Sequence, residues 1–156
     1  MGYVKKFKKQ EEDFARKILT EANESVQAST DEEDMFEHWD IKLETKFDVK
    51  AVKKINRSDV DTDETIHWVE LKNVRGKLGW LYGEADYFAF ELDEYWVVVE
   101  KKTLQDFIAE KLKDKIESET PSLYKIYKRT KYDKLDWITL VKTIDLMYLS
   151  EKIIKK

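Results

Sequence analysis

Three side chains in the middle of the chain have the types and spacing needed to hold a divalent cation beside a phosphate. Asp48 lies in one run of alternating residues, and Glu70 and Lys72 lie one residue apart in the next. Carboxylate oxygens are hard ligands that suit Mg²⁺, and a bound divalent ion polarises a phosphate and lowers the pKa of an attacking water. A nearby lysine can position that water or neutralise developing charge. The pattern predicts a hydrolytic metal site, with the main-chain carbonyl of Leu71 as a further ligand.

Two strands joined by a polar turn are needed to bring these residues together. Apolar and polar residues alternate over 38–55 and again over 66–74, which is typical of half-buried strands. If the two strands pair as an antiparallel hairpin that turns near residues 59–60, Asp48 lies opposite Glu70 or Lys72. All three side chains then share one face of the sheet, because side chains alternate between faces with period two.

The same three residues also have a plain structural explanation. They can form a cross-strand ladder of salt bridges on a wet sheet face, worth a fraction of a kcal/mol per pair. Charged residues make up 40% of the chain, so an acid and a lysine separated by one residue are expected by chance. The spacing alone leaves both interpretations open.

The remaining patterns predict an α/β (α+β) chain with one mixed sheet flanked by helices. Three- and four-residue steps of apolar residues indicate helices, and alternating or continuous apolar runs indicate strands. The expected helices are 4–22, 104–116 and 144–154, and the further strands are 86–92, 95–100, 123–129 and 137–141. At 156 residues the chain fits a single domain, 1–156, with a substantial core. Residues 23–37 are expected to form a loop or a short second helix.

Composition narrows the classes of protein. There is no cysteine, which excludes disulfides and thiolate metal sites, and two histidines are too few for a histidine-based zinc site. No secretion signal or apolar membrane span is seen, so we expect a cytoplasmic protein that does not enter membranes. The net charge of −4 argues against a simple nucleic-acid-binding protein. Residues 111–156 nevertheless carry twelve Lys and Arg against seven Asp and Glu, which suits a phosphate-gripping region.

A family resemblance adds to this interpretation. Asp48, followed by Glu70-Leu71-Lys72 on the next expected strand, resembles the Asp…(Asp/Glu)-x-Lys signature of the PD-(D/E)XK nuclease superfamily. The stretches WDIKLETKFDVKAVKK, WVELKNV, GWLYGEADYFAFE and YKIYKRTKYDKLDWITLVKTIDL are similar to small phage and prophage members. The likeness spans about three quarters of the chain. Phe47 stands where the family name has proline.

The resemblance implies a restriction-endonuclease-like core and a Mg²⁺- or Mn²⁺-dependent nuclease, acting on DNA rather than RNA, in a bacterial host cell if the protein is phage-derived. Asp48, Glu70 and the Leu71 carbonyl would bind the metal, and Lys72 would assist the attacking water. Many members also carry an acid in the first helix. Glu11 is the candidate because it falls within the apolar stripe, with Glu12 or Glu21 as alternatives. The alternative hypothesis is a catalytically inactive module of this fold that binds nucleic acid or a protein partner. The protein could also form a homodimer.

Several residues are candidates for contacts with nucleic acid. Trp80 and Tyr82 sit in a glycine-bracketed loop and can either stack on bases or anchor the loop on the sheet. Basic candidates for backbone phosphates are Lys50, Lys125, Lys128, Arg129 and Lys131, with Lys134 beside them; ordinary strand-surface lysines would look the same. His67 falls on the strand face opposite Glu70, which favours a packed residue over a ligand.

Overall fold

The computed structural model describes residues 8–22, 27–28, 33, 37–42, 45–52, 61–73, 76–131 and 134–156. The chain divides into two compact units, each built from separate stretches of sequence. We call residues 1–51, 83–100 and 150–156 the acidic unit, because they carry twenty Asp and Glu against twelve Lys and Arg. Residues 52–82 and 101–149 form the basic unit, with seventeen Lys and Arg against thirteen Asp and Glu.

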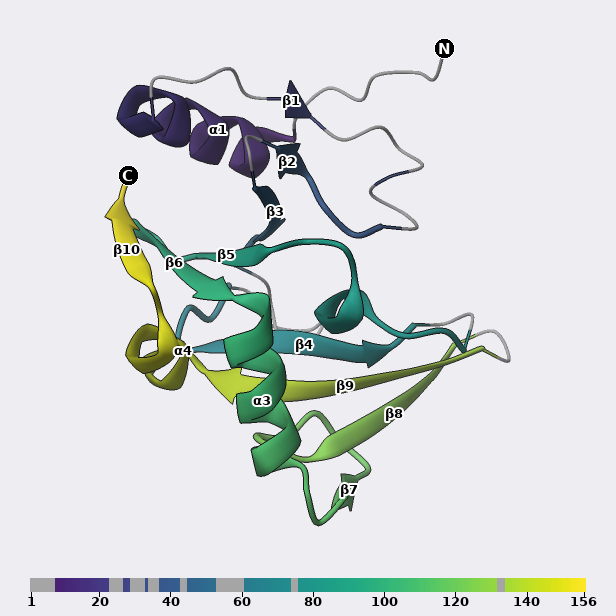
Figure 1. Ribbon diagram of the computed structural model, residues 1–156. Coiled ribbons are helices and arrows are strands. Elements are labelled where there is room, and N and C mark those ends of the chain that lie inside the picture. Colours follow the sequence, from purple (N-terminus) through teal and green to yellow (C-terminus); the bar gives the residue numbers. More distant parts are fainter. Residues whose placement is uncertain are drawn as a thin grey trace. The chain divides into compact units, whose positions relative to one another are not determined.

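In its described residues, the acidic unit contains a six-stranded sheet and helix α1. Its strands lie in the order β1-β2-β3-β5-β6-β10 (Figure 1), and β3 and β5 run parallel whereas the other neighbours are antiparallel. The elements are α1 (Lys9–Ala22), β1 (Gln27–Ala28), β2 (Ile41–Lys42), β3 (Lys46–Lys50), β5 (Tyr87–Glu91), β6 (Tyr95–Glu100) and β10 (Lys152–Lys155).

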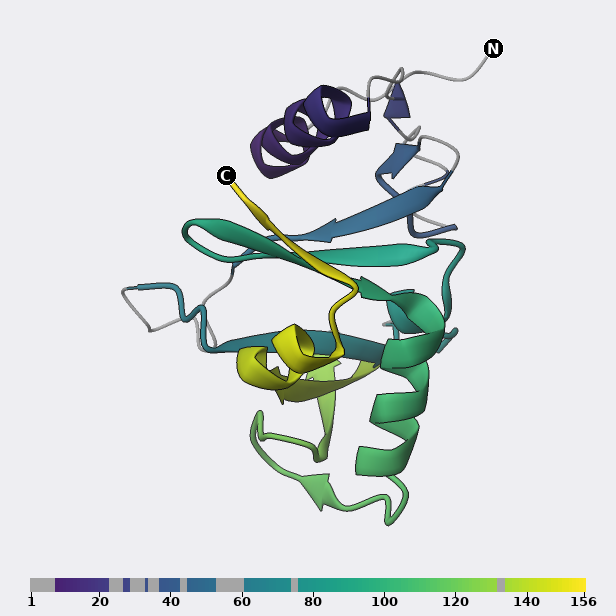
Figure 2. The same ribbon diagram turned by 60° about the vertical axis from the view of Figure 1, so that its left-hand side comes forward.

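Helix α1 covers one face of this sheet, as Figure 2 shows. Its apolar stripe supplies Phe14, Ala15 and Ile18 to a buried cluster that also includes Val49 and Trp96. The ring of Phe14 meets the rings of Phe47 and Trp96 edge to face, at centroid distances of 5.5 and 5.4 Å. Odd-numbered residues of β3 therefore point toward α1, and the even-numbered Asp48 and Lys50 point to the other face.

The described residues of the basic unit form a four-stranded sheet, two helices and a short 3₁₀ turn. Its strands lie in the order β4-β9-β8-β7; β7 and β8 run parallel, and the other neighbours in this sheet are antiparallel. The elements are β4 (Ile66–Lys72), η1 (Trp80–Tyr82), α3 (Lys101–Lys111), β7 (Glu117–Ser118), β8 (Ile126–Lys131), β9 (Lys134–Lys142) and α4 (Thr143–Leu149). The side-chain amide of Gln105 on α3 donates to the carbonyl oxygen of Leu81 in η1 at 2.9 Å.

These sheets confirm the mixed α/β class and correct two finer expectations. The described strands form two mixed sheets, where one was expected. The predicted hairpin between the strands of Asp48 and Glu70 is wrong: β3 pairs with β2 and β5, whereas β4 pairs with β9. Alternation correctly placed extended structure in both segments, although the segment 38–55 contains two antiparallel strands, β2 and β3, where one was expected. Alternation carries no information about which strand is the neighbour. The middle of the predicted turn, residues 53–60, lies outside the described residues.

The element boundaries also shift near the C-terminal end. The closing helix expected over 144–154 ends at Leu149, and β10 follows it as an antiparallel neighbour of β6. Ile154 is buried and Ile153 is 42% exposed, so the last apolar pair alternates as a strand does. The predicted residues Val4 and Phe7 of the first helix, and most of the segment 23–37, lie outside the described residues.

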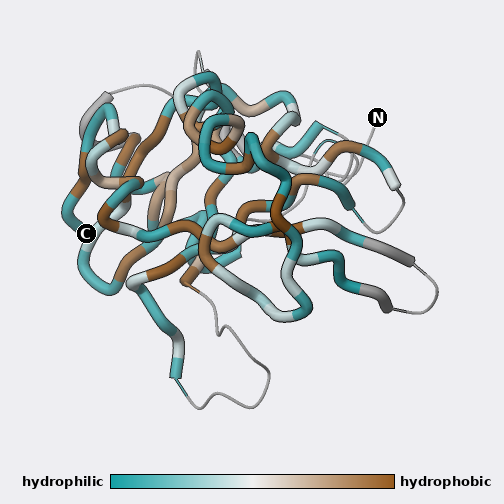
Figure 3. The backbone as a smooth tube through the Cα atoms, turned by 90° about the horizontal axis from the view of Figure 1, so that it is seen from below, coloured by the Kyte–Doolittle hydropathy of each residue, from teal (hydrophilic) through white to brown (hydrophobic). Residues whose placement is uncertain are grey.

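Among the described residues, no helix is long and apolar enough to cross a membrane. Hydrophobic stretches (brown in Figure 3) are short and are interrupted by hydrophilic residues (teal).

Candidate functional site

Asp48 is the acidic side chain whose surroundings most need an explanation. It lies on β3, is only 3% exposed, and stands opposite Phe88 of the parallel neighbour β5. Its Oδ1 is 2.9 Å from the ammonium of Lys50. Its Oδ2 is buried and has no hydrogen-bond partner among the described residues. Because a buried carboxylate oxygen without a donor is costly, an atom of this kind points to a cation or water that completes the site.

A β-bulge separates Glu70 from Lys72. Glu70 pairs with Ile138 of β9, and Lys72 pairs with the next residue, Trp137, so that Leu71 is the extra residue in β4. Directly opposed residues share a face and successive residues alternate. Glu70 and Lys72 therefore point to opposite faces of the four-stranded sheet, and the expectation that they share a face is wrong. The two-residue spacing predicted a regular strand, which the bulge interrupts.

Glu70 is held against the loop that follows β4. Its Oε1 accepts a hydrogen bond from the backbone N–H of Trp80 at 3.3 Å, and the Leu71 carbonyl accepts one from Gly79 at 3.0 Å. A side chain at position 79 would begin 2.3 Å from the Glu70 carbonyl oxygen, so only glycine allows this approach. The pKa of Arg129 is raised chiefly by its hydrogen bond to Asp136, and the charge of Glu70 contributes least among the causes.

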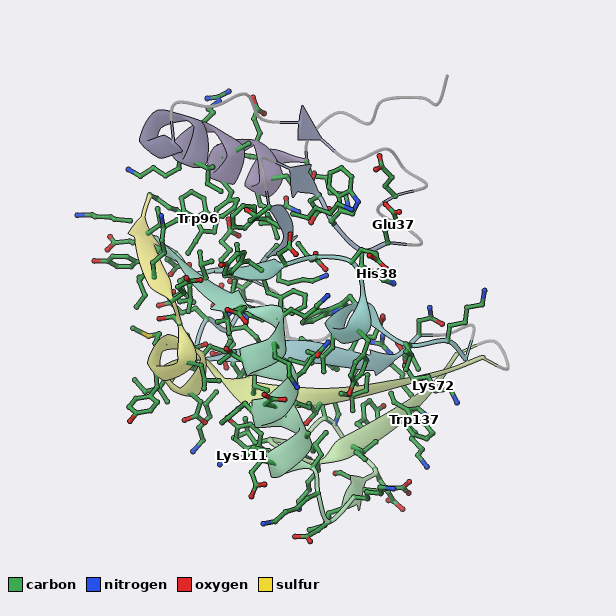
Figure 4. The ribbon with its side chains drawn as sticks, viewed as in Figure 1. Glu37, His38, Lys72, Trp96, Lys111 and Trp137 are labelled. Carbon is green, nitrogen blue, oxygen red and sulfur yellow. The ribbon has the colours of Figure 1, made fainter. Side chains whose placement is uncertain are left out.

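Lys72 lies over an aromatic ring on the other face. Its ammonium is 4.7 Å from the ring centroid of Trp137, and the ammonium of Lys128 is 4.4 Å from the same centroid. Figure 4 shows Lys72 and Trp137 beside one another. No carboxylate of a described residue forms an ion pair with Lys72.

Glu11 has a local structural role. It is the third residue of α1, and its Oε2 accepts the backbone N–H of Lys8, just before the helix, at 2.8 Å. This is half of a capping box, which satisfies one of the N–H groups left without a partner where a helix begins. Glu11 is 2% exposed. A role at a metal centre stays a prediction.

The predicted nucleic-acid contacts fall into different environments. Trp80 is 9% exposed, which favours the interpretation that it anchors the loop. Tyr82 is 44% exposed. Lys128 forms an ion pair with Glu117, and Arg129 binds both oxygens of the buried Asp136 at 3.0 and 2.5 Å. Lys50 is held by Asp48, Lys125 is exposed, and the side chains of Lys131 and Lys134 lie outside those described. His67 is buried, as the packed reading predicted.

The fit of these residues to a divalent metal rests on Asp48. No group of three or more metal-ligating side chains gathers among the described residues. Mg²⁺ is commonly held by only one or two carboxylates and keeps several waters, so such a group is not required. Asp48 offers a buried oxygen with no donor among described residues, which suits a hard cation. Glu70 and the Leu71 carbonyl are oxygen donors in the basic unit.

Two contacts were missed from the sequence. The lysine beside the buried acid is Lys50, and Asp48-Val49-Lys50 has the same acid-x-lysine spacing as Glu70-Leu71-Lys72. Trp137 was expected only as part of a strand, and its position between two lysines depends on strand order. The contact between Asp48 and Lys50 could have been predicted, because the lysine follows the acid by two residues on one strand. No local pattern predicts the contacts of Trp137 with two lysines.

Comparisons with known proteins add no relative: no family model, curated protein or solved structure matches this chain.

Proposed function

We propose that this protein is a metal-dependent nuclease that hydrolyses phosphodiester bonds, with DNA as its substrate. The observation that carries the proposal is the buried Asp48 carboxylate, whose Oδ2 has no hydrogen-bond partner among the described residues. A buried strand position is rigid, and rigid positions are where catalytic ligands are best held. The likeness of the sequence to PD-(D/E)XK nucleases is the second support.

In this proposal Asp48 would hold Mg²⁺ or Mn²⁺, and the family resemblance names Glu70 and the Leu71 carbonyl as further donors. When bound, such an ion supplies charge stabilisation at the phosphate and a more acidic water. The resemblance gives Lys72 the role of assisting the attacking water. Lys50, whose ammonium is 2.9 Å from Asp48 Oδ1, places a positive charge beside the buried carboxylate while no metal is present.

Thermal unfolding with Mn²⁺ and cleavage of a supercoiled plasmid test the proposal together. Wild type should melt at a higher temperature in Mn²⁺, because a ligand that binds the folded state stabilises it, and should nick the plasmid. Asp48→Asn should lose both responses. Asp93→Asn is the matched control, since it removes the same charge from an exposed turn of the same unit and should keep both. A wild type that neither shifts nor cleaves, or an Asp48→Asn that still cleaves, overturns the proposal.

A second function, a module that binds nucleic acid or a protein partner without cleaving, is favoured by the bulge in β4. Lys72 points to the face opposite Glu70, away from where a nuclease lysine is needed. Binding of nucleic acid without Mn²⁺-dependent cleavage, across a range of DNA and RNA substrates, would support this alternative.

A further inference from the structure

Three residues on neighbouring strands of the basic unit form a row in which only one, Lys72, has a role in the proposed catalytic chemistry. Trp137 lies on β9, with Lys72 of β4 directly opposite on one side and Lys128 of β8 directly opposite on the other. We call Lys72, Trp137 and Lys128 the Lys–Trp–Lys row. Because directly opposed residues share a face, all three side chains project from the same side of the sheet.

The row combines a partly exposed ring with two ammonium groups. The ammonium of Lys72 is 4.7 Å and that of Lys128 is 4.4 Å from the centroid of Trp137. Trp137 and Lys72 are half-buried and Lys128 is exposed. Lys128 has Glu117 as an ion-pair partner, but no described carboxylate pairs with Lys72. One positive charge in the row is thus available to an anion from outside.

The charge of the surrounding unit favours an anionic ligand. The basic unit has four more Lys and Arg than Asp and Glu, although the whole chain has four fewer. Lys77 and Lys125, both exposed, belong to the same unit. A local surplus of positive charge raises the concentration of a polyanion near this surface.

We propose that the Lys–Trp–Lys row binds single-stranded nucleic acid, with a base stacked on Trp137 and the two lysines on the flanking phosphates. Stacking of a base on an aromatic ring is stronger than an exposed cation–π contact, so a base can displace a lysine from the ring. The displaced ammonium sits on a flexible four-carbon stem and can reach a neighbouring phosphate. This inference rests on the proposed function only for the class of ligand.

The indole explains why a single strand is preferred. In a duplex the bases are stacked on each other, and phosphate contacts alone would leave Trp137 without a role. An acidic peptide would likewise engage the ammonium groups and leave the ring unused. Dependence of binding on both the ring and the lysines is therefore the signature of an unpaired base.

Fluorescence anisotropy with a labelled oligothymidylate in EDTA measures this binding without metal or cleavage. Lys72→Gln should weaken binding and reduce the slope of log affinity against log salt by about 0.7, the value for one phosphate contact on a single strand. Trp137→Leu should weaken binding roughly 5- to 100-fold, and Trp137→Phe should recover most of that loss. Lys111→Gln is the matched control, because Lys111 also lies over two rings, Phe107 and Tyr124, in the same unit.

The outcomes separate this inference from the proposed function. Equal losses in Lys72→Gln and Lys111→Gln, or equal affinity for the matched duplex or polyglutamate, would overturn the row as a single-strand site. If Trp137→Leu does not fold, Trp137→Phe and the salt slope of Lys72→Gln decide the question. A protein that never cleaves can still pass this binding test, and a nuclease can fail it. Lys72→Gln that loses cleavage rate but not metal-free affinity would assign Lys72 to catalysis and overturn its place in the row.

Discussion

The acidic and basic units each bury an aspartate on a strand, but the two carboxylates have different partners. In the basic unit Asp136, 1% exposed, receives two hydrogen bonds from the guanidinium of Arg129. In the acidic unit Asp48, 3% exposed, has the ammonium of Lys50 at Oδ1 and no described partner at Oδ2. The planar guanidinium matches both oxygens of a carboxylate, whereas an ammonium acts as a single point charge.

This difference separates a structural acid from a candidate functional one. Asp136 is satisfied by the chain itself, so it needs nothing from solution. Asp48 is similarly buried, but only one of its two carboxylate oxygens has a partner among the described residues. This is unusual unless a group from solution binds the other oxygen. A buried carboxylate that is held on a strand and keeps one oxygen without a hydrogen-bond donor is the arrangement expected at a site that binds a ligand.

The largest expected effect is a loss of stability at low pH, caused by a residue of the basic unit. Burial lowers the pKa of His67 from 6.5 to about 4. The unfolded chain binds this proton below about pH 6.5 and the folded chain only below about 4. The contribution of His67 to the free energy of unfolding is therefore fully present above pH 6.5. It falls by roughly 3 kcal/mol as the pH drops to 4. Urea unfolding from pH 7 to 4 should show this slope in wild type and His38→Gln and a flatter slope in His67→Gln. Equal slopes in all three would remove His67 as the cause.

Asparagine at the two buried aspartates should give unequal costs. Asp136→Asn removes one partner of a bidentate pair, and because Arg129 is about half exposed (47%) the loss should be about 2 kcal/mol, below that of a fully buried pair. Asp48→Asn should cost less, about 1 kcal/mol in metal-free buffer, because it removes one contact with an ammonium rather than two hydrogen bonds from a guanidinium. Denaturant midpoints of the two variants measure this difference. The reverse order would end the distinction drawn between the two acids.

The smallest effect should be seen on removing the lysine beside Asp48. In Lys50→Gln the metal no longer competes with an ammonium 2.9 Å from the carboxylate. The stabilisation by a fixed concentration of Mn²⁺ should then rise by up to about 1 kcal/mol, as expected for several-fold tighter binding. Lys42→Gln, on the neighbouring β2, serves as the control for lost positive charge. A smaller Mn²⁺ response in Lys50→Gln than in wild type would contradict a competing role for Lys50.

Local patterns predicted most of the elements. The continuous apolar runs around Phe88 and Val98 gave β5 and β6 almost to the residue, and the stripe of Phe14 and Ile18 gave α1. These patterns succeeded because burial of one face or of both faces of an element is directly reflected in its residue types. It also predicted that His67 and Glu70 lie on opposite faces, as their partners on β9 confirm.

The candidate site was harder to predict because it depends on partners distant in sequence. The pairing of β3 with β5 joins Asp48 to Phe88, forty residues apart, and no alternation within β3 selects that neighbour. The bulge at Leu71 reverses the face of Lys72 through one extra residue, which a period-two pattern does not reveal. Residue types could suggest carboxylate chemistry, but strand order and register determine which side chains meet.

Strand β10 has a consequence for how the protein is made. Residues 101–149, which include most of the basic unit, lie in the sequence between β6 and β10, and β10 pairs with β6 in the acidic sheet. As the chain leaves the ribosome, every strand of the basic sheet is available before β10 is synthesised. Until then one edge of β6 exposes unpaired backbone groups, a target for aggregation or chaperones. The translation order thus leaves the acidic sheet to be closed last.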